Sequence, residues 1–172
     1  MPRLSWPDTR ATAWCSLAAR MISFDWRKRL LQGALGGLLG GVVMAVISMS
    51  VSLLQGPGLW MPVKLIGGFV LGLRAINSVG GFDVMPIVSG LAIHMLVSAG
   101  LGGLFGLLVV SLPKVTVALY GVVYAIAIWF LALFIVLPVA DPLLVHNTNP
   151  VFFALSHIAY GAVLGWWAGT RV

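Results

Sequence analysis

Two histidines carry the chemistry that this sequence could support in an apolar setting. His94 and His157 each lie in an apolar segment of helix length. Each is followed by small residues at offsets of 4, 8 and 12 positions, which are Ser98, Gly102 and Gly106 in one segment and Gly161, Gly165 and Gly169 in the other. Imidazole is a common metal ligand and titrates near neutral pH. The pair could therefore ligate haem b or a pigment, bind a metal such as copper or zinc, or handle protons.

A structural role is the alternative, and it is the interpretation that we favour. A neutral histidine buried between helices bonds to a hydroxyl or a backbone carbonyl on a neighbouring helix, and such contacts are worth about 0.6 kcal/mol on average in membranes. Ser98 lies one helical turn after His94, and Tyr160 lies close to His157 in the sequence. His146, in a predicted loop, could add a third metal ligand, but we expect it to be solvated.

The composition places these segments in a membrane. Of the 172 residues, 60% are hydrophobic and 8% are charged, whereas soluble domains carry about a quarter charged residues. A membrane-spanning helix needs about 20 apolar residues. We predict an all-α, polytopic membrane protein with a four-helix transmembrane domain over 31–172. The predicted spans cover 31–54, 86–112, 115–138 and 151–169.

Residues 1–30 form a basic segment that is predicted to lie on the cytoplasmic side. Six of the ten lysines and arginines fall here, and residues 14–21 have the apolar spacing of a short interfacial amphipathic helix. The net charge of +6 is therefore attributed to orientation and to contact with anionic lipid, and not to nucleic acid. With Lys114 and Arg171 included, eight basic residues against two favour an N-in, C-in topology.

The stretch between the first two spans is apolar but too short to cross a membrane. Gln55-Gly56-Pro57-Gly58 ends the first span, and residues 62–76 carry Lys64 and Arg74. We predict that 62–76 lies in the membrane interface or partly re-enters the membrane.

Glycines predict how the spans pack, because small residues let helix backbones approach where lipid supplies no hydrophobic drive. The residues expected at these contacts are Gly33, Gly37, Gly41, Gly102, Gly106, Gly161, Gly165 and Gly169. Gly36 and Gly40 form a second register, assigned to packing within the chain, with a partner helix or a second copy as the alternative. Gly41-Val42-Val43-Met44-Ala45 also matches Gly121-Val122-Val123-Tyr124-Ala125. Together with the histidine offsets, this match indicates two parallel copies of a two-helix hairpin.

The last span contains the run Ser156-His157-Ile158-Ala159-Tyr160-Gly161-Ala162-Val163-Leu164-Gly165-Trp166, and the third contains Leu119-Tyr120-Gly121-Val122-Val123 with Trp129 and Pro138. These segments, and His94 in the second span, resemble a family of uncharacterised bacterial four-span membrane proteins. The resemblance covers about residues 31–169. It implies a four-span architecture and no particular reaction, and the expected location is the bacterial cytoplasmic membrane.

The sequence favours a non-catalytic role. All four aspartates fall outside the apolar runs and glutamate is absent. We expect an accessory or scaffold subunit of a larger membrane complex, in contact with other membrane proteins or with a second copy of itself. The first alternative is a haem- or pigment-binding electron-transfer module that uses His94 and His157. The second is a small transporter or channel gated by 62–76, which the lack of an intramembrane carboxylate disfavours.

Overall fold

The computed structural model describes residues 25–76, 81–109 and 112–170, and every regular element among them is a helix. Four segments are long and apolar enough to cross a membrane, namely α2 (Trp26–Gln55), α4 (Val84–Leu108), the segment Lys114–Ala140 and α8 (Pro150–Ala168). The prediction of an all-α chain with four membrane-spanning helices is confirmed at this level. The amphipathic helix predicted over 14–21 lies outside the described residues.

The helix boundaries differ from the predicted spans by a few residues. α2 begins at Trp26 because the Asp25 side chain accepts a hydrogen bond from the Lys28 backbone N–H (3.2 Å) and so caps the helix. The basic run after Asp25 therefore forms the first turn of α2. α4 is shorter than predicted at its C-terminal end, where Leu108 is its last residue.

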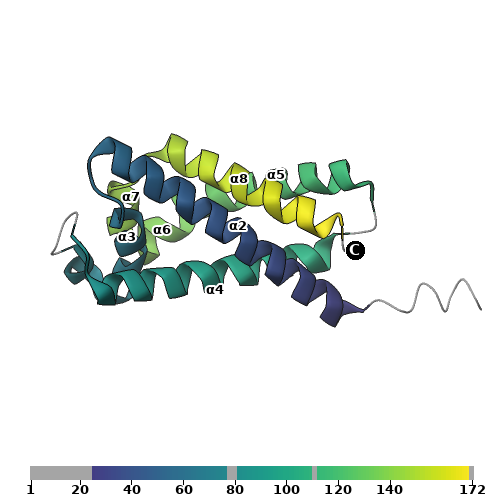
Figure 1. Cartoon of the computed structure of the whole chain (residues 1–172), viewed down its shortest axis with the longest axis horizontal. Helices are drawn as coiled ribbons and strands as arrows, with labels where there is room; N and C mark the ends of the chain where they lie inside the picture. The colour runs from purple at the N-terminus through teal and green to yellow at the C-terminus, as the bar shows by residue number, and fades with distance from the viewer. Residues whose placement is uncertain (1–24, 77–80, 110–111, 171–172) are drawn as a thin grey trace, which may run out of the picture.

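The third span contains one wide turn. It consists of α5 (Lys114–Leu131), the π-helical turn η2 (Ala132–Val136) and α6 (Leu137–Ala140). Asp141 follows and caps the short helix α7 (Pro142–His146), which starts with a proline at the position where helices tolerate it. α7 lies against α3 at one end of the molecule (Figure 1).

The predicted interfacial stretch forms α3 (Met61–Leu71) and the 3-10 helix η1 (Gly72–Ile76). Gly72 has a φ of 59°, a left-handed value that suits glycine and ends α3. α3 packs against the start of α4, where Gly67 and Gly90 bring the two backbones into contact. Lys64 is fully buried in α3. The interfacial position of this stretch stays a prediction.

The long helices are arranged in the order α4, α2, α8, α5, and each is antiparallel to the next (Figure 1). α4 and α5 approach each other less closely, and aromatic side chains connect them. Tyr124 of α5 donates a hydrogen bond to the Leu101 carbonyl of α4 (2.8 Å), and its ring lies against Phe105 with 5.1 Å between the centroids. The row of helices is therefore closed by side chains and not by backbone contact.

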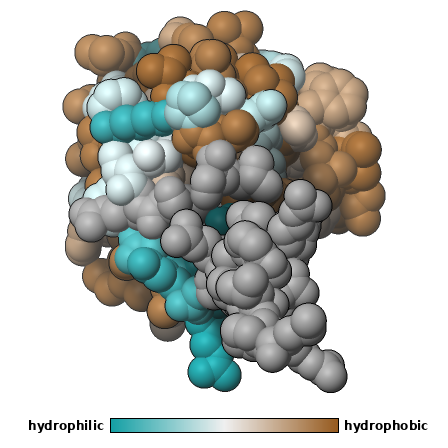
Figure 2. Space-filling model, turned by 90° about the vertical axis from the view of Figure 1, so that its right-hand side faces the viewer, coloured by the Kyte–Doolittle hydropathy of each residue, from teal (hydrophilic) through white to brown (hydrophobic). Residues whose placement is uncertain are grey.

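The two ends of the domain differ in charge. At one end, the basic end, lie the exposed Arg27 and Lys28 together with Lys114, whose ammonium group sits 3.6 Å from the centroid of the Trp166 ring. Figure 2 faces this end and shows hydrophilic residues on it, with hydrophobic side chains around the sides. The short helices α3, α6 and α7 occupy the opposite end, called the cavity end (Figure 1).

Candidate functional site

A cavity of about 580 Å³ lies in the cavity end of the domain. The last turns of α2, the middle of α4, the end of the third span and the start of α8 surround it, and α3 and α7 cover it. Its walls are mainly aliphatic and aromatic, with side chains that include Val51, Leu65, Ile66, Phe69, Val97, Leu131 and Leu137. Close-packed protein interiors contain few voids larger than a water molecule. A space of this size is therefore a candidate ligand site.

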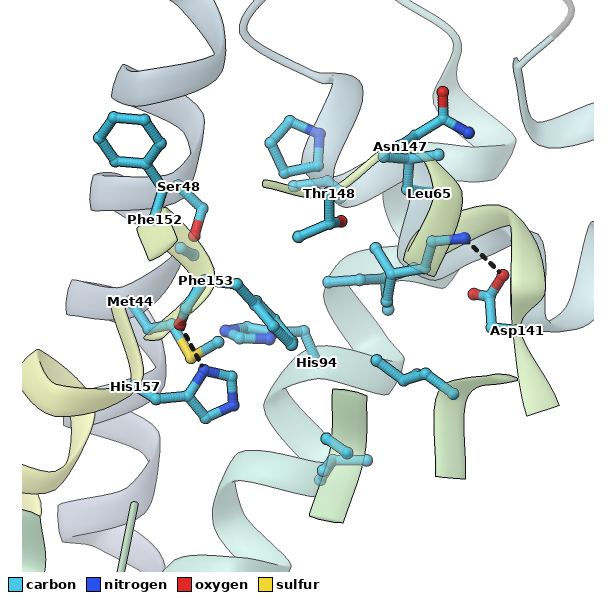
Figure 3. A pocket seen from close by; sticks show the side chains of 18 of the residues that line it. Met44, Ser48, Leu65, His94, Asp141, Asn147, Thr148, Phe152, Phe153 and His157 are labelled. Atoms are coloured by element: carbon cyan, nitrogen blue, oxygen red, sulfur yellow. Dashed lines mark hydrogen bonds between the residues drawn. The ribbon is translucent and has the colours of Figure 1, made fainter. Parts of the chain in front are cut away.

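Both predicted histidines line this cavity, so the fold brings them together at one site (Figure 3). The Nε2 atom of His94 lies 2.9 Å from the Gly41 carbonyl oxygen of α2. The Nδ1 atom of His157 lies 2.8 Å from the Phe153 carbonyl oxygen, one turn earlier in α8. The His157 side chain is buried, and the Phe153 ring meets it edge to face with 4.4 Å between the centroids.

These partners determine which ring nitrogens carry the protons. A carbonyl oxygen can only accept a hydrogen bond, so Nε2 of His94 and Nδ1 of His157 must each bear a hydrogen. In a neutral ring the other nitrogen then holds a lone pair, which is Nδ1 in His94 and Nε2 in His157. Ligating histidines characteristically donate their second ring N–H to a carboxylate or a carbonyl. The bonds to Gly41 and Phe153 match that arrangement.

The eight predicted packing glycines lie away from the cavity, toward the basic end, and none of them lines it. A side chain added at Gly33, Gly37, Gly102 or Gly106 would overlap backbone atoms across the α2–α4 contact. Gly161, Gly165 and Gly169 meet backbone atoms of α5, while Gly41 meets the Ser98 side chain.

The second glycine register of α2 packs within the chain, as expected. A Cβ at Gly36 would lie 2.8 Å from the Trp167 ring, and one at Gly40 would lie 2.9 Å from the Tyr160 carbonyl oxygen, both in α8. α2 therefore uses two glycine faces, one against α4 and one against α8.

His146 does not join the histidine pair. His146 is exposed at the end of α7 and does not line the cavity. Within residues 25–76, 81–109 and 112–170, no group of three or more histidine, cysteine, aspartate or glutamate side chains is placed to hold a metal ion.

Asp141 is a cavity residue that the sequence analysis missed. Asp141 is only 4% exposed. It lies between the third and fourth predicted spans and precedes a proline, a context that predicts a loop. Oδ1 accepts a hydrogen bond from the Leu144 backbone N–H (3.1 Å). Oδ2 is buried and has no hydrogen-bond partner among the described residues. Burial raises the pKa of the Asp141 carboxyl above its usual range, and the Leu144 bond opposes this shift.

Other polar side chains at the cavity end are occupied by local backbone. The Ser52 hydroxyl donates to the Gly58 carbonyl (2.8 Å), and the Asn147 amide donates to the Leu143 carbonyl (2.9 Å). Asn149 caps α8 by accepting from Val151 and Phe152 N–H groups. The carboxylate of Asp141 and the two imidazoles are the titratable acceptors of the cavity, and Figure 3 places Asp141 on the opposite side of the cavity from His157.

Comparisons of the chain with protein-family models, with curated proteins and with solved structures gave no match.

Proposed function

We propose that this chain is a non-catalytic membrane protein that holds a lipid-soluble small molecule in its cavity and serves as an accessory subunit of a larger membrane complex. The observation that carries the proposal is the apolar cavity of about 580 Å³ at one end of an otherwise close-packed helix domain. Ligand sites typically enclose about 300–1,000 Å³ behind mainly hydrophobic walls with a few polar groups. The cavity falls within this range.

A cavity-filling variant tests ligand binding. Ala132 lines the cavity from η2, whereas Ala127 is exposed one turn earlier in the same span. Lipid-soluble molecules that co-purify with the chain in lipid nanodiscs are extracted and identified by mass spectrometry. We expect a stoichiometric ligand in the wild type and in Ala127→Phe, and its loss in Ala132→Phe. Equal ligand content in all three proteins, or none in any, would overturn this part of the proposal.

The accessory role needs a face that is free for a partner. Both glycine faces of α2 are covered by α4 and α8, whereas α5 keeps an apolar face with Leu119, Val123 and Phe130 exposed. This face is the one that we assign to another membrane protein or to a second copy of the chain. Photo-crosslinking groups placed at Val123 should capture one specific protein, and groups at the buried Val117 should not. Capture of lipid alone from Val123 would contradict this assignment.

Haem or pigment ligation by His94 and His157 is the second candidate. Its support is the hydrogen bonding of both rings. One nitrogen of each imidazole donates to a backbone carbonyl, which leaves the lone pair of the other nitrogen available to ligate iron. The chain, purified in mild detergent from cofactor-replete cells, should then show a Soret band and reduced α and β bands. A colourless protein would exclude this candidate.

The proposed topology is N-in and C-in in a bacterial cytoplasmic membrane. Its support is the position of Arg27, Lys28 and Lys114 at one end of the domain, since positive residues are retained on the cytoplasmic side. Single cysteines are introduced at Thr170 and at Asn147 in a Cys15→Ser background and treated with an impermeant maleimide. The cysteine at Thr170 should react only after the cells are lysed. The cysteine at Asn147 should react with intact cells. The reverse pattern would invert the topology.

We also infer that the α2–α4 and α5–α8 hairpins are two copies of one unit. Gly37 meets the Ser98 carbonyl and the Gly102 Cα, while Gly121 meets the Gly161 carbonyl and the Gly165 Cα. Ser98 and Gly161 lie at the same offset from His94 and His157, and so do Gly102 and Gly165. The contacts therefore make Gly37 the counterpart of Gly121, one helical turn away from the Gly41–Gly121 match in the sequence. Exchange of the α2–α4 glycine ridge for its α5–α8 counterpart should preserve folding.

A further inference from the structure

We propose that the cavity binds a lipophilic organic cation, with Asp141 as its counter-charge. This inference rests on the proposed function, because it names the class of the molecule that the cavity holds. The cation would place its apolar groups along the aliphatic and aromatic walls and its charge toward the α6–α7 junction.

The charge of the cavity lining is the first argument. Asp141 is the single charged side chain among the residues that line it, and no lysine or arginine is among them. Lys64 of α3 is fully buried but does not form part of the lining, and His146 of α7 is exposed outside it. A ligand in this cavity therefore meets one carboxyl group and no lysine or arginine side chain.

The hydrogen-bonding state of Asp141 is the second argument. Oδ1 is used by Leu144, whereas Oδ2 is buried without a hydrogen-bond partner among the described residues. A buried carboxylate is costly unless an opposite charge or donors compensate it. The lone-pair nitrogens of His94 and His157 also suit hydrogen-bond donors. The other polar lining side chains, among them Ser48, Gln55 and Thr148, are neutral. The single charge of the lining thus favours a positive ligand.

The aromatic lining is the third argument. Phe69, Phe152 and Phe153 line the cavity together with Tyr160. Aromatic faces attract organic cations, and this attraction strengthens where water is excluded. A volume of about 580 Å³ also fits a molecule of drug size and not a bare inorganic ion.

The exposure of two lining residues indicates how such a ligand arrives. Val97 of α4 and Leu131 of α5 both line the cavity and are 52% and 50% exposed. These residues lie where α4 and α5 are not packed backbone to backbone. A lipophilic ion dissolved in the membrane can therefore enter sideways between the two helices.

Equilibrium dialysis of the full chain in neutral phosphatidylcholine nanodiscs tests the inference. The probes are tetraphenylphosphonium, a lipophilic cation, and triphenylphosphine oxide, a neutral molecule of similar shape. We expect one tetraphenylphosphonium per chain and binding at least about tenfold weaker in Asp141→Asn, a difference of about 1.4 kcal/mol. Asp141→Glu keeps the charge and should retain binding. Asp83→Asn removes a carboxylate that does not line the cavity and is the matched control.

The outcomes separate this inference from the proposal on which it rests. If Asp141→Asn, shown to be folded by size-exclusion chromatography and circular dichroism, binds tetraphenylphosphonium like the wild type, the cation assignment is wrong. If the neutral probe binds equally well and Ala132→Phe removes it, the cavity is a ligand site without charge selection. If Ala132→Phe reduces the binding of neither probe, the proposed ligand-binding function fails as well.

Discussion

The half of the domain next to the basic end and the half next to the cavity end are held together in different ways. Near the basic end, glycines bring α2 against α4 and α5 against α8, so that backbones touch. Near the cavity end, side chains from all four spans and from the short helices α3 and α7 surround open space. From the basic end toward the cavity end, His94 and His157 are the first large side chains on the glycine-bearing faces of α4 and α8. Beyond His94, α4 contacts α3 through Gly90. A change of side-chain size at one position per helix thus separates a packed region from a hollow one.

The largest effect is expected where the packed half is broken. A Cβ at Gly102 would overlap the Gly33 carbonyl oxygen, whereas Gly100, two residues earlier in α4, has open space around it. Gly102→Ala should destabilise the fold by about 1–3 kcal/mol through overpacking. Gly100→Ala should stabilise it by up to about 1 kcal/mol, because alanine favours helices. Thermal unfolding in detergent, followed by circular dichroism, compares the two. Equal melting temperatures would mean that backbone contact does not hold this half together.

The next effect lies at the border between the halves. The buried Tyr160 hydroxyl donates to the Ser98 carbonyl (2.9 Å) and joins α8 to α4. Tyr160→Phe should cost at most about 1.7 kcal/mol, the upper range for hydrogen bonds between membrane helices. Tyr120→Phe, on an exposed part of α5, is the control and should change nothing. If Tyr160→Phe loses as much stability as Gly102→Ala, Tyr160 belongs to the packed half and not to the border.

A smaller effect is expected for the histidine that faces Gly41. His94→Gln can keep one hydrogen bond to the Gly41 carbonyl, while His94→Leu cannot. We expect His94→Leu to cost about 0.6 kcal/mol more than His94→Gln in unfolding experiments on the ligand-free protein. If glutamine instead abolishes a bound chromophore without loss of stability, His94 is a ligand and not a packing residue.

The smallest effect is expected in the pH dependence of stability, through Asp141 in the cavity half. The native pKa of Asp141 is raised by burial, so the native state binds a proton more tightly than the unfolded chain does. The free energy of unfolding of the ligand-free protein should therefore fall as the pH rises from the ordinary aspartate range through the raised native value. The Leu144 hydrogen bond opposes this shift of the Asp141 pKa. Asp141→Asn, compared with wild type across acidic pH, should remove this slope.

The sequence predicted the packed half better than the cavity half, for a physical reason. Glycine spacing encodes contacts between straight helices, so Gly36 and Gly40 could be assigned to packing within the chain before the fold was known. Apolar runs likewise located four helices. The cavity depends instead on how α3, α6 and α7 fold over the bundle end, and short helices leave little periodicity in the sequence. Asp141 read as a loop residue because its burial is produced by those three elements together.

The histidines show the limit in another way. Their equal offsets predicted equivalent positions in two spans, and both side chains reach one cavity although α2 lies between α4 and α8 in the row of helices. The hydrogen-bond partner of His157 did not follow from the sequence. We expected a partner on a neighbouring helix, whereas the Phe153 carbonyl of the same helix accepts the hydrogen bond. The residue offsets describe which side chains share a face. They do not describe how a ring is turned.

The wide turn Ala132–Val136 has a consequence for how this site could arise or be lost. A π-helical turn holds one residue more than the α-helical turn that it replaces, so the helix beyond it keeps its rotational phase. Removal of that residue would restore an α-helical turn and leave Asp141 on the same face of the span. The same deletion in the regular turn of α6 would instead turn Asp141 by about 100° and draw it about 1.5 Å along the axis. The wide turn therefore marks a place in this span where a one-codon deletion spares the position of the carboxyl group.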